Sequence, residues 1–159
     1  MRIESPGVEV VEAVAELWVQ LAADQRTHGS HLEPAENREV IRETLARHAV
    51  TDGLRVARDD EDAIVGFVTF EISGGAYEQD VVRGVVRNLY VVPGRRDEGI
   101  GSDLLAVAET ALAERGADVV ALEAMADNEA GRRFYRRHGY DSHRVEFETT
   151  TDTHTNPDE

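Results

Sequence analysis

The sequence predicts a mixed α/β fold, in which a mostly antiparallel central sheet carries helices on both faces. Two stretches before residue 50 have apolar residues at helical spacing, and three strand-like stretches follow between residues 54 and 92. A strand–helix–strand unit and a further helix come after them. Because an antiparallel meander precedes a single crossover, this order favours a mixed sheet over a doubly wound parallel one.

The first 50 residues contain one short strand and two helices. Residues 2–4 are the strand. Apolar residues such as Val14 and Leu21 recur through residues 8–26 with the period of an amphipathic helix. A polar loop with two histidines separates this stretch from a second helix over residues 37–49.

Three strands follow. Residues 54–58 and 64–72 are rich in β-branched and aromatic residues, and the four acids between them form a charged hairpin turn. A loop with two glycines leads to the third strand, over residues 81–92.

The last third of the chain alternates helices and strands. We expect a helix over residues 99–115, a strand over 119–124, a helix over 128–137 and a final strand over 141–150. The full order is β-α-α-β-β-β-α-β-α-β. Its 159 residues are enough for one domain, which we place at 1–150, before a disordered polar tail over 151–159.

An Arg/Gly loop joins the third of these strands to the helix that follows it. A helix N-terminus presents unpaired backbone N–H groups and the positive end of the helix dipole. Gly99 and Gly101 let a bulky anion approach those amides, and Arg95 and Arg96 add positive charge. The loop therefore has the physical properties of a diphosphate site.

Two motifs carry a resemblance to a known family. Residues 96–101 (RDEGIG) resemble the [QR]-x-x-G-x-[GA] signature of the GNAT acetyltransferase superfamily. Residues 128–140 (NEAGRRFYRRHGY) resemble its N-x-x-[AG]-x-x-x-Y-x-x-x-G-[FY] motif. The second motif lies one strand after the first, as it does in the family.

The resemblance implies a GNAT fold that binds acetyl-CoA as cosubstrate, with no metal. The strand before the loop would splay from its neighbour, so that the pantetheine arm pairs with exposed backbone, while the loop amides hold the pyrophosphate. The residues that this implies for cofactor binding are Leu89, Tyr90, Val91, Arg96, Asp97, Glu98, Gly99, Ile100, Gly101, Ser102, Asn128 and Tyr135.

The same resemblance implies N-acetylation of a primary amine by direct attack on the thioester. The acceptor is a small molecule, a protein N-terminus or a lysine. Tyr135 is expected to protonate the leaving thiolate, although an aromatic residue on a short helix also packs in a core. No acid lies between Asp80 and Asp97, so the strand before the loop carries none and the expected base is Glu123, in an otherwise apolar strand. An outward-facing Glu123 is the alternative. Glu78, His28 and His31 are weaker candidates for substrate contact, since each is more often just a loop residue.

Asp97 and Glu98 depart from the family pattern, which has Gly and a basic residue there, and two acids weaken diphosphate binding unless they face solvent. A non-catalytic acyl-CoA-binding module is the alternative function, which the missing strand carboxylate favours, whereas the Tyr135 motif favours the enzyme. A nucleotide site of the P-loop or dinucleotide type is disfavoured, because the chain has no lysine and lacks the third glycine with its downstream acid.

Composition narrows the remaining classes of function. The 32 acids against 17 basic residues, all of them Arg, give a net charge of −15, which disfavours nucleic acid as a partner. Because the acids are spread over every segment, they favour adaptation to a salt-rich cytoplasm over the alternative, an acidic surface that attracts a cationic substrate. With no cysteine, thiol catalysis and disulfides are excluded. No apolar run resembles a signal peptide or membrane span, so we expect a cytoplasmic protein, able to form a homodimer through its last strand.

Overall fold

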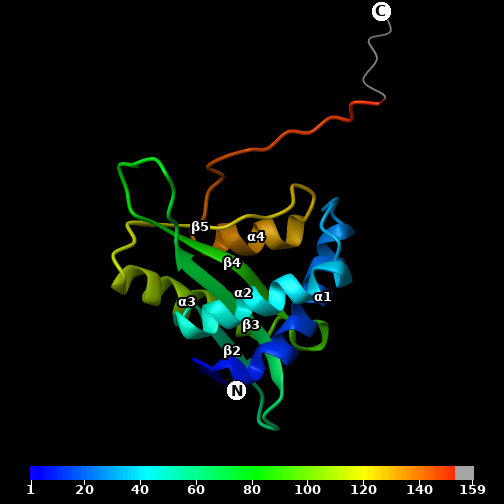
Figure 1. Cartoon of the computed structure of the whole chain (residues 1–159), viewed down its shortest axis with the longest axis vertical. Coiled ribbons are helices and arrows are strands. Elements are labelled where there is room, and N and C mark those ends of the chain that lie inside the picture. The colour runs from blue at the N-terminus through cyan, green and yellow to red at the C-terminus, as the bar shows by residue number, and fades with distance from the viewer. Residues whose placement is uncertain (153–159) are drawn as a thin grey trace, which may run out of the picture. The chain divides into compact units, whose positions relative to one another are not determined.

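The computed structural model describes residues 1–152, and its centre is a sheet (Figure 1). In this part of the chain the sheet has five strands in the order β1-β2-β3-β4-β5. Strands β1 to β4 pair antiparallel, whereas β4 and β5 pair parallel. Their bounds are Arg2–Glu4 (β1), Leu54–Arg58 (β2), Ile64–Ile72 (β3), Arg83–Val91 (β4) and Val119–Ala121 (β5).

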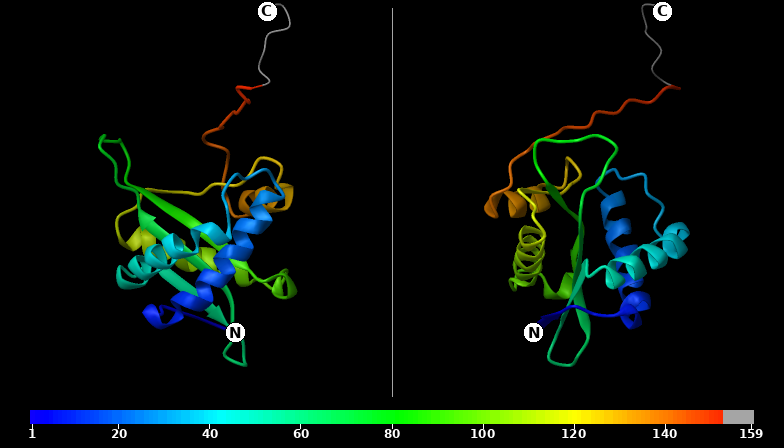
Figure 2. Two further views of the ribbon diagram at one scale, coloured as in Figure 1. Left: turned by 45° about the vertical axis from the view of Figure 1, so that its right-hand side comes forward. Right: turned by 60° about the vertical axis from the view of Figure 1, so that its left-hand side comes forward.

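Helices cover both faces of the sheet. The α-helices are Val11–Arg26 (α1), Arg38–Val50 (α2), Ile100–Glu114 (α3) and Glu129–Arg137 (α4), and the 3-10 turns are Val8–Val10 (η1), Ala35–Asn37 (η2) and Pro93–Arg95 (η3). The chain forms two compact units, Met1–Asn128 and the part from Glu129 onward, which are described separately. Within the first unit, α1 and α2 lie on one face of the sheet and α3 on the other (Figure 2).

The larger core lies between the sheet and the pair α1 and α2. Val14 and Leu45 are fully buried there against Val56 of β2 and Phe67 of β3. Pairing of Val56 with Phe67 and of Phe67 with Tyr90 puts these three side chains on the same face. The predicted amphipathic helices therefore bury their apolar stripes as expected.

On the opposite face, α3 approaches the sheet closely at a glycine. A Cβ on Gly66 of β3 would lie 2.8 Å from the Tyr90 carbonyl oxygen and 3.2 Å from a methyl of Leu104. Leu104, Leu105 and Leu112 of α3 are fully buried. Gly66 thus fixes how near the helix that follows the Arg/Gly loop lies to the sheet.

The structure confirms the fold class and most of the predicted elements. Strands β1, β2 and β3 have the predicted bounds, while β4 begins at Arg83, two residues late. β5 ends at Ala121, so residues 122–124 of the predicted strand lie outside the sheet. The early end of β5 matters for the site, because β4 continues without it.

The predicted last strand is wrong. Residues 141–150 have no regular secondary structure and are all exposed, with 66% of Val145 and 91% of Phe147 accessible to solvent. Two alternating apolar side chains make only a small apolar face, which is too little to specify a strand. The predicted disordered tail falls largely on residues 153–159, which lie outside the described residues. No helix within residues 1–152 is long and apolar enough to cross a membrane.

Candidate active site

The site begins where β4 and β5 part. Their parallel pairing runs from Arg83 with Val119 to Val85 with Ala121 and stops there. β4 continues to Val91. The rest of β4 therefore has an edge that is not paired to β5.

The hydrogen bonds of β4 show which of its backbone N–H and C=O groups point toward this open edge. The N–H of Val92 donates to the carbonyl of Val65 at 2.9 Å, so the backbone groups of residue 92 face β3. Along a strand these directions alternate, so the N–H and C=O groups of Leu89 and Val91 face the open edge. An extended ligand placed there can pair with them as an added strand would.

The N-terminus of α3 lies at the end of the Arg/Gly loop. Gly99 precedes the helix with φ +84°, a left-handed conformation that favours glycine, and no side chain caps the helix. The N–H of Asp103, which bonds to the Gly99 carbonyl at 3.0 Å, begins the helical ladder. A Cβ on Gly99 would meet nothing within 4 Å. Open space thus adjoins the positive end of the α3 dipole, as an anion site requires.

The two loop arginines have different partners. Arg95 Nε lies 3.0 Å from Glu98 Oε1, and Arg95 Nη1 lies 3.3 Å from Asp59 Oδ2, so Arg95 neutralises Glu98. Asp97 is exposed and adopts φ +64°, again a conformation in which glycine is unstrained. Of the two acids that depart from the family pattern, Glu98 therefore has a counter-ion, whereas we find none for Asp97 within residues 1–152.

Arg96 lies across the end of β4. Its Nε donates to the Val91 carbonyl at 2.9 Å, its guanidinium stacks 5.4 Å from the centre of the Tyr90 ring, and Nη2 lies 3.3 Å from Asp24 Oδ2 on α1. Tyr90 itself turns away from the open edge. Its hydroxyl lies 3.3 Å from Gln20 Oε1, and burial raises its pKa. Of the three β4 residues predicted to bind the cofactor, Tyr90 therefore differs from Leu89 and Val91: its backbone groups face β3, and its ring faces α1.

Carboxylates are absent from the described β4 residues. Arg87 Nε pairs with Glu71 Oε1 at 3.3 Å, and Asn88 Nδ2 donates to the buried Thr69 hydroxyl at 2.8 Å. The expectation that Glu123 is partly buried in a strand is wrong, because β5 ends before it and its side chain is exposed. Asn128 follows in a turn, where its N–H donates to the Met125 carbonyl at 3.0 Å.

Tyr135 belongs to the second unit, on α4. Its ring lies 5.5 Å from that of Phe134 and 6.1 Å from that of Tyr140, in edge-on contacts. Burial raises the pKa of Tyr135 above its ordinary value. The phenol therefore stays protonated at neutral pH and is chemically able to donate a proton.

The sequence did not predict a hydrogen-bonded pair formed by a histidine and an aspartate. His28 Nδ1, after α1, lies 2.9 Å from Asp127 Oδ1, after β5. Both residues lie in loops, and 99 positions separate them, so no spacing pattern signalled the contact.

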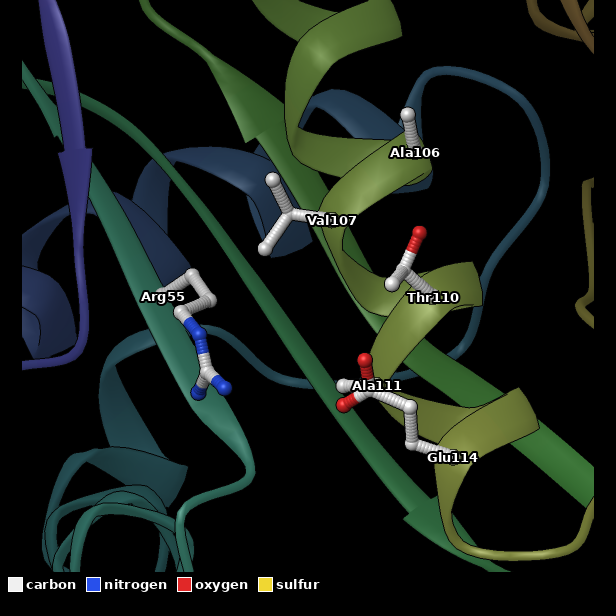
Figure 3. Close-up of a pocket in the computed structure, with 6 residues that line it drawn as sticks. All are labelled: Arg55, Ala106, Val107, Thr110, Ala111 and Glu114. Atoms are coloured by element: carbon white, nitrogen blue, oxygen red, sulfur yellow. The ribbon is translucent and has the colours of Figure 1, made fainter.

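The described residues also form a pocket elsewhere in the first unit. Figure 3 shows this open pocket of about 310 Å³ between α3 and β2, lined by Arg55 of β2 and by Ala106, Val107, Thr110, Ala111 and Glu114 of α3. None of the predicted site residues lines it. Within residues 1–152, no group of three or more His, Asp or Glu side chains is placed to hold a metal ion.

An open β4 edge that leads into an uncapped, glycine-bounded helix N-terminus defines a site for an extended ligand ending in an anion. A sequence model of the acetyltransferase (GNAT) family matches residues 15–140. The chain therefore belongs to the GNAT acetyltransferase family.

Its relatives and structural neighbours agree with this assignment. A mycothiol acetyltransferase of Clavibacter sepedonicus is 36% identical over 125 residues, which are 77% of this chain but 38% of that protein. A mutant of the BH1408 protein of Bacillus halodurans superposes with a TM-score of 0.78 at 18% identity, covering 94% of this chain and 99% of the other. The PaiA N-acetyltransferase of Thermoplasma acidophilum, solved with coenzyme A, gives 0.70 at 20% identity, covering 91% and 92%. At these identities the two structures share the fold.

Proposed function

We propose that this chain transfers an acetyl group from acetyl-CoA to a primary amine. The observation that carries the proposal is the open edge of β4 beside the α3 N-terminus. Leu89 and Val91 present backbone groups for the pantetheine arm, and Gly99 leaves room for the pyrophosphate. These backbone groups and this open space are what support acetyl-CoA as the cosubstrate. The proposed amine acceptor is a small molecule, a protein N-terminus or a lysine.

In this reaction, a neutral amine attacks the thioester carbonyl while backbone donors polarise its oxygen. Tyr135 is the proposed acid for the departing thiolate, since burial keeps its hydroxyl protonated. The remaining predicted contacts, from Arg96 to Ser102 and at Asn128, belong to this same proposal. A homodimer and a salt-rich cytoplasm also stay predictions.

A second candidate is a non-catalytic acyl-CoA-binding module. This candidate is favoured because the chain offers no buried carboxylate base at either expected place. Glu123 is exposed, and β4 carries no carboxylate. The two candidates share the cofactor site and differ in whether an amine is consumed.

Calorimetry with acetyl-CoA in about 2 M KCl, which screens the acidic surface, tests the shared part of the proposal. Gly99→Glu places a charged side chain in the space over the α3 N-terminus and should abolish binding. Gly94→Glu is the matched control, since Gly94 also has open space around it but lies in η3. It should retain binding.

A screen of primary amines with detection of released thiol then separates the candidates. Turnover supports the transferase, and acetyl-CoA binding without turnover supports the module. Wild-type affinity in Gly99→Glu would contradict the placement of the pyrophosphate, whatever the screen shows.

A further inference from the structure

His28 and Asp127 form a hydrogen-bonded pair in the first unit. His28 Nδ1 lies 2.9 Å from Asp127 Oδ1. An ionised carboxylate only accepts hydrogen bonds, so Nδ1 must carry the hydrogen. This fixes the tautomer and leaves the Nε2 lone pair as a proton acceptor. Asp127 bonds to Nδ1, and within residues 1–152 we find no group bonded to Nε2 of His28.

The pair joins the two segments that flank the open edge of β4. His28 belongs to the loop between α1 and α2, and Asp127 to the segment that leaves β5. Both views of Figure 2 show these segments side by side above the sheet. Asp127 also immediately precedes Asn128, the residue expected to contact the pantetheine.

A chain of contacts connects His28 to the diphosphate loop. The turn at the end of α1 continues through His28, whose N–H donates to the Gln25 carbonyl at 3.0 Å. Asp24 therefore lies one helical turn before His28, and it pairs with Arg96 at 3.3 Å. Arg96 in turn bonds to Val91 at the open edge. These contacts link the end of α1, which leads into His28, to the end of the open edge, and we place the approach of the acceptor to a thioester held on β4 on this side.

We infer that His28 is the general base of the proposed transfer and that Asp127 is its positioning residue. The inference rests on the proposed function. His28 is 34% exposed, so it is accessible to an acceptor without being fully hydrated. Glu123, the base expected from sequence, has no comparable partner in the described contacts and is exposed.

The proton balance is as follows. The acceptor arrives as an alkylammonium, and Nε2 of neutral His28 removes one proton to give an imidazolium. The amine nitrogen then bonds to the thioester carbon, and the carbon–sulfur bond breaks as the tetrahedral adduct collapses. The thiolate takes a proton from Tyr135, and the second nitrogen proton restores that phenol. The imidazolium returns its proton to water, so one proton is released per amide formed.

The test compares His28→Gln, Asp127→Asn and Glu123→Gln in steady-state kinetics from pH 5 to 9. The acceptor is the amine used best among ethanolamine, glucosamine, spermidine and the peptide Ala-Gly-Ala. His28→Gln should lower kcat/KM for the amine about 100-fold and remove the acidic limb of the pH profile that a general base imposes. Its affinity for acetyl-CoA should not change. Asp127, the charged group bonded to this histidine, is not altered in that variant.

Asp127→Asn should lower kcat/KM for the amine and change its dependence on pH. An amide can also stabilise the Nε2–H tautomer of His28, in which Nε2 cannot accept a proton. Nitrogen-15 NMR should find the Nδ1–H tautomer of His28 in the wild type and a mixture in Asp127→Asn. His143→Gln, at an exposed histidine of residues 141–150, is the control and should match the wild type.

Unchanged kinetics in His28→Gln, or a limb lost in Glu123→Gln instead, would overturn the assignment while leaving the transferase intact. An Nε2–H tautomer in the wild-type protein would overturn it as well. Acetyl-CoA binding without transfer to any amine of the panel would reject both the base and the transferase, and no acetyl-CoA binding would reject the cofactor site itself.

Discussion

Arg96 Nε donates to the carbonyl oxygen of Val91 at 2.9 Å, and this contact closes one end of the open β4 edge. The same guanidinium stacks on Tyr90 and pairs with Asp24. A pantetheine arm that pairs with Val91 needs this carbonyl, and a pyrophosphate attracts the guanidinium. Movement of Arg96 from Val91 toward the pyrophosphate would therefore satisfy both requirements.

Replacement of Arg96 should weaken acetyl-CoA binding more than replacement of its neighbour Arg95. We expect Arg96→Leu to raise the Kd about tenfold, because a charge-assisted hydrogen bond to the ligand is lost. Arg95→Leu is the matched control, since Arg95 is held by Glu98 and Asp59 and should change the Kd little. Calorimetry measures both. Equal losses in the two variants would indicate a general charge effect and contradict a specific role for Arg96.

Asp97 provides a test of the loop backbone. Its φ of +64° is strained for a side chain with a Cβ, and its charge lies in the predicted diphosphate loop. Asp97→Gly should raise the free energy of unfolding by up to about 1 kcal/mol and tighten acetyl-CoA binding. Asp97→Asn removes the charge but keeps the Cβ, so it should tighten binding without the gain in stability. Urea unfolding and calorimetry separate the two effects, and a less stable Asp97→Gly would contradict the strain.

The pattern of apolar residues was sufficient to predict most of this fold. Long periodic stretches such as α1 and β3 contain enough apolar positions to specify both the element and the buried face. The predicted final strand relied on Val145 and Phe147 alone, and a strand also needs a pairing edge, which its own sequence does not report.

The site could be predicted only where chemistry is local in sequence. The loop from Arg96 to Gly101 is contiguous, so its motif could be recognised. The pairing of His28 with Asp127 depends on the path of two loops, and the exposure of Glu123 depends on where β5 ends. These are tertiary properties, and neighbouring residues do not encode them.

Tyr135→Phe tests the proposed acid. The substitution keeps the ring contacts with Phe134 and Tyr140 but removes the proton, so turnover should fall at least about tenfold, with little change in acetyl-CoA affinity. Tyr77→Phe is the control, because the Tyr77 side chain is 89% exposed. Full turnover by Tyr135→Phe would remove the phenol from the mechanism and leave water to protonate the thiolate.

His48 links the stability of the first unit to pH. The residue is buried on α2, and desolvation lowers the pKa of His48, although Glu71 at 3.8 Å opposes the shift. Arg47 and Arg87 add to the lowering. Below the ordinary histidine pKa of about 6.5, the unfolded chain therefore binds a proton that the folded chain does not.

Stability from His48 is thus complete above pH 6.5 and is lost as the pH falls toward the folded-state pKa. This one group contributes a slope of at most about 1.4 kcal/mol per pH unit to the free energy of unfolding. Urea unfolding between pH 7 and 5 should show a smaller loss in His48→Gln than in the wild type. His143→Gln should keep the wild-type slope, because His143 is exposed. An equal slope in the wild type and His48→Gln would mean that carboxylates alone set the pH dependence, since the neutral glutamine cannot take up a proton in this range.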